Sequence, residues 1–120
     1  MCVKDTGNPG PARTARTIDQ LVDLGLADAG TRQALEAVAD QFAVAITPTV
    51  IETIADDSDS PVARQFVPDA RELEIAPGER DDPIGDAAHE AVQGIVHRYP
   101  DRVLLNAVRV CAVYCRYCFR

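Results

Sequence analysis

An apolar run between Arg102 and Val110 leads directly into three closely spaced cysteines. The run is interrupted only by Asn106 and Arg109. Such continuous apolarity is typical of a strand that is buried on both faces, as in parallel sheets covered by helices. A parallel neighbour requires a crossover of about a dozen residues or more, and only ten residues follow Val110. We therefore expect the sequence to be the N-terminal part of a longer α/β protein.

The preceding chain is predicted to be mainly helical. Four stretches have helical periodicity, and each follows a residue that is a suitable N-cap. These caps are Thr17, Thr31, Thr47 and Ser60. The second helix is expected to be the longest, with Leu35, Val38, Phe42 and Ile46 on one face. Further on, we expect a weak edge strand near Leu73, a turn at Pro77–Gly78 and an acidic loop at Asp81–Gly85.

These patterns divide the chain into three expected parts. Residues 1–16 are predicted to be a flexible leader, because they are rich in glycine and proline. Residues 17–96 are predicted to form a helical region with acidic loops, in which Asp56, Asp57 and Asp59 are solvated surface rather than a metal site. Residues 97–120 are predicted to hold the first strand of an α/β barrel and the cysteine loop at its active-site rim.

Composition and charge restrict the class of protein. Hydrophobic residues are 47% and charged residues 26% of the chain, which is typical of a soluble globular domain. We expect no membrane span and no signal peptide, and therefore a cytoplasmic protein. The net charge of −7 argues against a nucleic-acid binder. Nevertheless, residues 97–120 hold five arginines and one acid, so this end carries +4 while the first 96 residues carry −11.

The cysteines Cys111, Cys115 and Cys118 have the spacing C-x3-C-x2-C. Disulfides are disfavoured, because the cytoplasm keeps thiols reduced and three cysteines leave one unpaired. Zinc normally takes four protein ligands, and the nearest histidine, His97, lies fourteen residues before Cys111. Burial in a core is disfavoured beside Tyr114 and Arg116. An iron–sulfur cluster fits best, because three thiolates leave one iron of a cubane open to another ligand, although zinc stays an alternative.

The segment from Cys111 to Arg120 resembles the radical S-adenosylmethionine (radical SAM) enzymes, which share this cysteine spacing and an aromatic residue before the third cysteine, here Tyr117. Three upstream segments resemble the lysine 2,3-aminomutase branch of these enzymes, and the resemblance covers about Phe42 to Arg120. The segments are Ala45–Pro48, Asp82–Ile84 and Gly94–Leu105. The resemblance implies a truncated (β/α) radical SAM barrel of which residues 97–120 are the first strand and cluster loop.

The resemblance also implies roles for particular residues. Cys111, Cys115 and Cys118 would hold three irons of a 4Fe-4S cluster, and the fourth iron would bind S-adenosylmethionine. Tyr117 would lie near the adenine, with packing under the loop as the alternative. Arg120 would hold the substrate carboxylate, with a solvated charge as the alternative. Finally, Arg98, Tyr99 and Arg102 would lie near the phosphate of pyridoxal phosphate, with a strand-entry turn and surface arginines as the alternative.

In the resembling family, a 5'-deoxyadenosyl radical starts the migration of the α-amino group of lysine to carbon three, yielding β-lysine. Pyridoxal phosphate requires a lysine anchor, and the chain has a single lysine, Lys4. We therefore expect the anchor and the residues that recognise the substrate ammonium to lie beyond this sequence, and the fragment alone to be inactive. The implied partners are a small amino acid and a reductant such as flavodoxin or ferredoxin, and the family also allows a homo-oligomer.

Three alternatives stay open at this point. The sequence around the cysteines also resembles enzymes that make (R)-β-lysine for the modification of elongation factor P. Another radical SAM enzyme is the next alternative. The non-enzymatic alternative is a small helical module with a structural zinc near its C-terminus.

Overall fold

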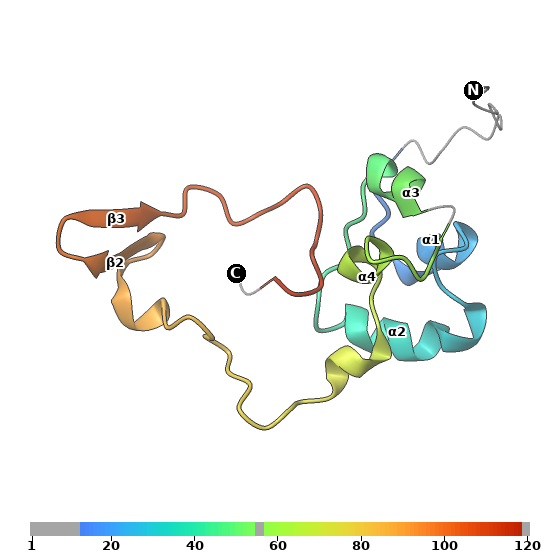
Figure 1. Ribbon diagram of the computed structural model, residues 1–120, viewed down its shortest axis with the longest axis horizontal. Coiled ribbons are helices and arrows are strands. Elements are labelled where there is room, and N and C mark those ends of the chain that lie inside the picture. The colour runs from blue at the N-terminus through green and yellow to red at the C-terminus, as the bar shows by residue number, and fades with distance from the viewer. Residues whose placement is uncertain (1–12, 55–56, 119–120) are drawn as a thin grey trace.

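The structure is a computed structural model that describes residues 13–54 and 57–118. It has a helical region, residues 13–54 and 57–73, followed by a small antiparallel sheet, and open segments of chain connect the two (Figure 1). The helices, with 3-10 helices labelled η, are α1 Ile18–Asp23, η1 Ala29–Thr31, α2 Arg32–Ala39, α3 Pro48–Ile54, α4 Ala63–Phe66, η2 Ala70–Leu73 and η3 Ala87–His89. The strands are β1 Glu90–Val92, β2 Ile95–Tyr99 and β3 Arg102–Leu105.

Three of the predicted helices begin where their caps indicate. Thr17 and Gln20 form a capping box at the start of α1, in which the backbone N–H of each residue donates to the side chain of the other. Pro48 is the first residue of α3, a position where the missing N–H of proline is not needed. Ser60 Oγ accepts from the Ala63 N–H at 3.1 Å at the start of α4. These local signals therefore predicted the structure correctly.

The second helix is shorter than predicted. It begins after Thr31 but ends at Ala39, so Phe42 and Ile46 lie outside it. Ile46 instead has extended backbone and forms an isolated antiparallel bridge with Ala15, with N–H to O=C distances of 2.9 and 3.0 Å in the two directions. This pairing satisfies the Ile46 backbone without a helix. Ala15, within the predicted leader, is buried by the same contact.

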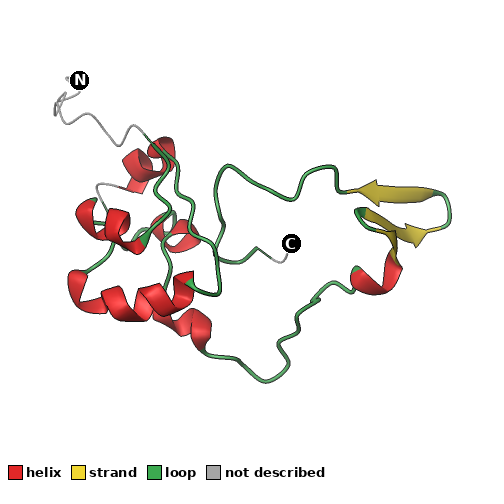
Figure 2. Cartoon of the chain, turned by 180° about the vertical axis from the view of Figure 1, so that it is seen from behind, coloured by secondary structure: helices red, strands yellow, loops and turns green. Residues whose placement is uncertain are grey.

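The hydrophobic core lies among α1, α2, α3 and α4, which gather at one end of the molecule, whereas η3 lies beside the sheet at the other end (Figure 2). Its most buried large side chains are Leu21, Val38, Ile46 and Ile54. These residues come from α1, α2, α3 and the extended segment before α3. Of the four periodic apolar positions predicted for the second helix, Leu35 and Ile46 belong to the main core cluster. The described residues contain no helix that is long and apolar enough to cross a membrane.

The sheet differs from the predicted parallel strand. Its order is β1-β2-β3, both pairings are antiparallel, and β2 and β3 are joined by a turn at Pro100 and Asp101. The prediction of a strand buried on both faces is wrong for the described residues, because β3 stops at Leu105 and its side chains are exposed. A tight turn brings β2 beside β3, so the two strands are antiparallel. The helices α1 to α4 lie at the other end of the molecule and do not cover β3 (Figure 1).

The weak edge strand predicted near Leu73 is also wrong, because Leu73 ends the 3-10 helix η2. Asp69 and Glu72 form a capping box at the start of this helix, and that box favours a helical turn over an extended strand. The turn at Pro77–Gly78 and the acidic loop before η3 are present as predicted. The described residues thus form an α/β structure of helices and one antiparallel sheet, and the radical SAM barrel stays a prediction.

Candidate cysteine site

The three cysteines lie on the loop that follows β3 and runs back from the sheet toward the helices (Figure 1). All three are free cysteines in the structure. Cys111 and Cys118 are exposed, and Cys115 is half-buried. The Cys118 N–H donates to the Cys115 carbonyl at 3.1 Å, so the last two cysteines share one turn.

The middle of the cysteine loop is attached to the helical region through its backbone. The Tyr114 N–H donates to the Ala45 carbonyl at 2.8 Å, and the Arg116 N–H donates to the Gln65 carbonyl at 2.8 Å. Ala45 belongs to the extended segment before α3, and Gln65 belongs to α4. The residues on either side of Cys115 are therefore fixed to two separate segments of the helical region.

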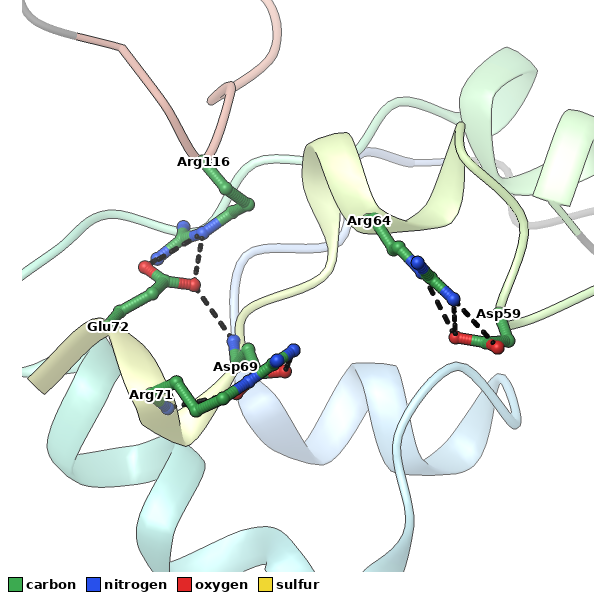
Figure 3. Close-up of polar contacts among 6 residues, drawn as sticks. All are labelled: Asp59, Arg64, Asp69, Arg71, Glu72 and Arg116. Carbon is green, nitrogen blue, oxygen red and sulfur yellow. Dashed lines mark hydrogen bonds and ion pairs between the residues drawn. The ribbon is translucent and has the colours of Figure 1, made fainter. Parts of the chain in front are cut away.

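Arg116 adds a side-chain attachment at the same place (Figure 3). Its Nε lies 3.0 and 3.2 Å from the two carboxylate oxygens of Glu72, and its Nη2 also contacts this carboxylate. Its Nη1 donates to the Ala43 carbonyl at 2.7 Å. The guanidinium carbon lies 5.0 Å from the centre of the Tyr114 ring, within cation–π range. The side chains of Arg116 and Glu72 are only 5% and 20% exposed.

Sequence reasoning did not find this pair. Glu72 precedes Arg116 by 44 residues, so no spacing rule links them. A partial signal exists in the sequence Asp69-Ala-Arg-Glu72, whose first and last residues are typical of a capping box. That pattern predicts a helical start and a fixed Glu72 side chain, but not its arginine partner.

Two of the three cysteines line one cavity. Cys111 and Cys118 border a space of about 420 Å³ between the sheet and the loop before η3, together with Val96, Val108 and Arg109. Cys115 is not among the residues that line it. The structure therefore brings Cys111 and Cys118 to a common space and holds Cys115 closer to the helical region.

Two of the acids that line this cavity, Asp82 and Glu90, accept hydrogen bonds from backbone N–H groups. The Asp82 carboxylate accepts from the backbone N–H groups of Asp86 at 3.0 Å and Ala87 at 2.8 Å. Glu90 Oε1 accepts from the Gly94 N–H at 2.7 Å and from Arg109 at 2.6 Å. Backbone hydrogen bonds, with Ala87 for Asp82 and with Gly94 for Glu90, are the main cause that lowers the pKa of each carboxyl below its ordinary value.

The thiols suit a soft metal centre by their chemistry. Thiolates are the ligands that iron–sulfur clusters and zinc share, and three of them lie within eight residues of one loop. Within the described ranges, however, no three His, Cys, Asp or Glu side chains are grouped closely enough to hold one metal ion. Binding one centre with all three sulfur atoms therefore requires Cys115 to approach Cys111 and Cys118. In the acidic run, Asp59 pairs with Arg64 at 3.0 Å, and Asp56 lies outside the described residues.

The remaining predicted site residues do not lie together. Arg98, Tyr99 and Arg102 line a second cavity of about 480 Å³ beside β3. Arg98 pairs with Asp86 at 3.0 Å, and the Arg102 guanidinium lies 5.6 Å from the centre of the Tyr99 ring. Tyr117 is exposed on the cysteine loop. Arg120 lies outside the described residues, as do Lys4 and the fourth cysteine, Cys2, which are not predicted site residues.

Comparison with known proteins identifies relatives of the chain. It is 39% identical over 94 residues to the L-lysine 2,3-aminomutase of Clostridium subterminale, a match that covers 75% of this chain and 23% of that protein. It is 45% identical over 62 residues to the L-lysine 2,3-aminomutase of Escherichia coli K12, covering 52% of this chain and 18% of that protein. It is 32% identical over 108 residues to the L-lysine 2,3-aminomutase of Bacillus subtilis 168, a match that covers 89% of this chain and 23% of that protein.

The matches cover only part of each relative. The chain spans about a fifth of the length of the curated relatives that it matches. No family model matches the chain, and no solved structure matches it.

Proposed function

We propose that the chain is a segment of an L-lysine 2,3-aminomutase, because it is similar to part of these enzymes. The similarity confirms the resemblance predicted from the sequence. The reaction would move the amino group of L-lysine from carbon two to carbon three. The observation that carries the proposal is the set of three reduced cysteines on one loop, attached to the helical region on both sides of Cys115.

The cysteine loop is the part of this proposal that the chain itself can supply. A 4Fe-4S cluster bound by Cys111, Cys115 and Cys118 would supply the electron that cleaves S-adenosylmethionine to a 5'-deoxyadenosyl radical. The exposed ring of Tyr117 is available to pack against the adenine of that cosubstrate. The cavity beside Cys111 and Cys118 is bordered by the apolar side chains of Val96 and Val108 and by Asp82 and Glu90, whose carboxylates accept from backbone N–H groups.

Pyridoxal phosphate fits this chain only in part. Two guanidinium groups and a phenol line the cavity beside β3, and guanidinium geometry suits a phosphate. We therefore propose that Arg98, Tyr99 and Arg102 contact the phosphate of the cofactor. The described residues contain no lysine that could anchor its aldehyde, so no chemical step is assigned to it within them. The role of Arg120 in holding the substrate carboxylate is likewise proposed from sequence alone.

Several finer points are part of the proposal. We propose that the reductant is a flavodoxin or ferredoxin, that the protein is cytoplasmic and that homo-oligomers form as in the resembling family. Because the chain spans about a fifth of its relatives, we expect this segment alone to be inactive. The relation to enzymes that modify elongation factor P stays the alternative for the physiological role.

The test is anaerobic reconstitution of the 120-residue chain with iron and sulfide. We expect about four irons and four sulfides per chain, with the brown colour and absorption of a 4Fe-4S cluster. Alanine in place of Cys111, Cys115 or Cys118 should reduce the iron content by at least half, because three thiolates are already fewer than a cubane normally receives.

The matched control is Cys2→Ala, which should leave the iron content unchanged. Zinc bound at one ion per chain with no iron would contradict the proposal and favour the helical zinc module. An iron content that falls as much in Cys2→Ala as in Cys115→Ala would show that the ligand set is wrong.

A further inference from the structure

The ion pair between Arg116 and Glu72 is built differently from the ion pairs on the surface of the helical region. The Arg116 and Glu72 side chains are 5% and 20% exposed, whereas those of Arg64 and Asp59 are 68% and 84% exposed. Both pairs are bidentate (Figure 3). Water screens the exposed pair strongly and the buried pair weakly, so only the buried pair is expected to hold its partners in a fixed position.

The Glu72 carboxylate is itself held in place. One of its oxygens, Oε1, accepts from the Asp69 N–H at 2.8 Å in the capping box of η2 (Figure 3). The same carboxylate accepts from Arg116 on its other side. Glu72 thus links the start of η2 to the cysteine loop, and its side chain has little freedom to follow the loop if the loop moves.

Arg116 occupies the position directly after Cys115 and two residues before Cys118. Its guanidinium reaches the Glu72 carboxylate and the Ala43 carbonyl, while its backbone N–H is bonded to Gln65. A buried guanidinium that loses its carboxylate is left as an unpaired charge, which is strongly unfavourable. The side chain would then leave for water, and the backbone of Arg116 would have to move with it.

We propose that Glu72 is a positioning residue for the cysteine loop: through Arg116 it holds Cys115 and the Cys115–Cys118 turn against the helical region, and so restrains the approach of Cys115 to Cys111 and Cys118 that a shared cluster requires. This inference rests on the proposed function, because it assumes that the loop binds a cluster. It goes beyond that function because it assigns a role to Glu72, a residue of η2 that is remote in sequence from the cysteines. That role is control over the rate at which the cysteines take up iron and sulfide.

The first experiment measures backbone hydrogen exchange in the 120-residue chain without iron. Glu72→Gln keeps the shape of the side chain and its capping acceptor but removes the charge that Arg116 needs. We expect the amides of Tyr114 and Arg116 to exchange at least about tenfold faster, which corresponds to about 1.4 kcal/mol. The Phe42 amide, bonded to the Val38 carbonyl at 2.8 Å, should be unchanged.

Two further variants keep the experiment decisive. Arg64→Gln breaks the exposed pair with Asp59 and should leave the Tyr114 and Arg116 amides unchanged. Arg116→Gln removes the other partner from the loop side and should reproduce the effect of Glu72→Gln even if the latter disturbs η2. Unchanged exchange at both loop amides in Glu72→Gln and Arg116→Gln overturns the proposal.

The second experiment measures the rate of iron and sulfide uptake by the same chains. We expect Glu72→Gln to load at least about threefold faster than the unsubstituted chain, because Cys115 is then released to approach Cys111 and Cys118, and Arg64→Gln to load at the same rate. If the unsubstituted chain loads and Glu72→Gln loads equally fast, positioning by Glu72 is overturned while the proposed function stands. If the unsubstituted chain takes up no iron at all, the proposed function itself is overturned.

Discussion

The fold lowers the pKa of the Asp69 carboxyl group. It accepts from the Arg71 guanidinium at 3.0 and 2.7 Å and from the Arg71 N–H at 2.9 Å. These bonds, the side-chain one first, lower the pKa of Asp69 from 3.8 to about 2. A lowered pKa in the folded state stabilises the fold above about pH 4, and the stabilisation is lost as the pH falls toward 2.

We predict that Asp69→Asn removes this part of the acid sensitivity. Because the Asp69 side chain is 47% exposed and water screens the pair, the lost stabilisation at neutral pH is expected to be about 1 kcal/mol or less. The measurement is the free energy of unfolding by urea at pH 6 and at pH 2.5. The difference between the two pH values should be smaller in Asp69→Asn than in the unsubstituted chain, and equal differences would contradict the assignment.

At the residue scale, the spacing of Cys111, Cys115 and Cys118 predicts a thiol-based metal site, because that chemistry depends on residue type and proximity along the chain, and this site stays a prediction. The spacing could not reveal that Arg116 is buried against Glu72, since this contact depends on how α4, η2 and the cysteine loop pack. From the sequence alone, an arginine next to a cysteine is indistinguishable from a solvated charge.

At the element scale, Gly94 lies in the turn between β1 and β2 and contacts Asn106, the residue that follows β3. It has a φ of +87°, and a Cβ at this position would lie 3.3 Å from the Asn106 carbonyl oxygen. The Asn106 N–H donates to the Gly94 carbonyl at 2.8 Å. We predict that Gly94→Ala increases hydrogen exchange at the Asn106 amide at least about fivefold, because the left-handed conformation is strained for alanine and the contact is tight.

The control for this prediction is Gly78→Ala. Gly78 has a φ of +97° but nothing within 4 Å of its Cβ position. It therefore carries a similar backbone strain without the contact to Asn106. Exchange at the Asn106 amide should be unaffected in Gly78→Ala, and an equal effect of both substitutions would mean that the contact with Asn106 has no part in it.

Element boundaries show where local signals stop being sufficient. The capping box of Thr17 and Gln20 and the Thr47-Pro48 start are read from a few adjacent residues, and both were predicted correctly. The end of α2 and the pairing of β3 depend instead on distant or competing partners. Ile46 pairs with Ala15, and β3 pairs with the strand just before it, so helical periodicity and apolar run length gave wrong answers there.

At the scale of the whole molecule, the described chain consists of a helical core and a separate sheet. Its Cα radius of gyration is 17.9 Å, against about 14 Å for a compact chain of this length. Exposed apolar side chains lie on the sheet and the loop after it; they include Val92, Val103, Leu105, Val108 and Val110. The core residues lie in the helices (Figure 2). The two parts are therefore expected to differ in stability.

The cysteine loop is expected to share the stability of the helical core. Tyr114 and Arg116 are bonded to Ala45 and Gln65, which belong to the helical region, although the loop follows the sheet in sequence. Leu21→Ala removes a fully buried side chain from α1 and should destabilise the core by about 2–5 kcal/mol. We predict that this substitution increases exchange at the amides of Tyr114, Arg116 and Phe42 together.

The amides of the sheet supply the internal comparison for Leu21→Ala. The Asn106 amide is bonded within the sheet region, to Gly94, and should keep the exchange rate that it has in the unsubstituted chain. Residue-resolved hydrogen exchange measures all four amides in one experiment. Loss of protection at Asn106 by the same factor as at Phe42 would show one cooperative unit. Protection retained at Tyr114 and Arg116 after the core has opened would show that the loop is held by the sheet, and that Glu72 cannot position it.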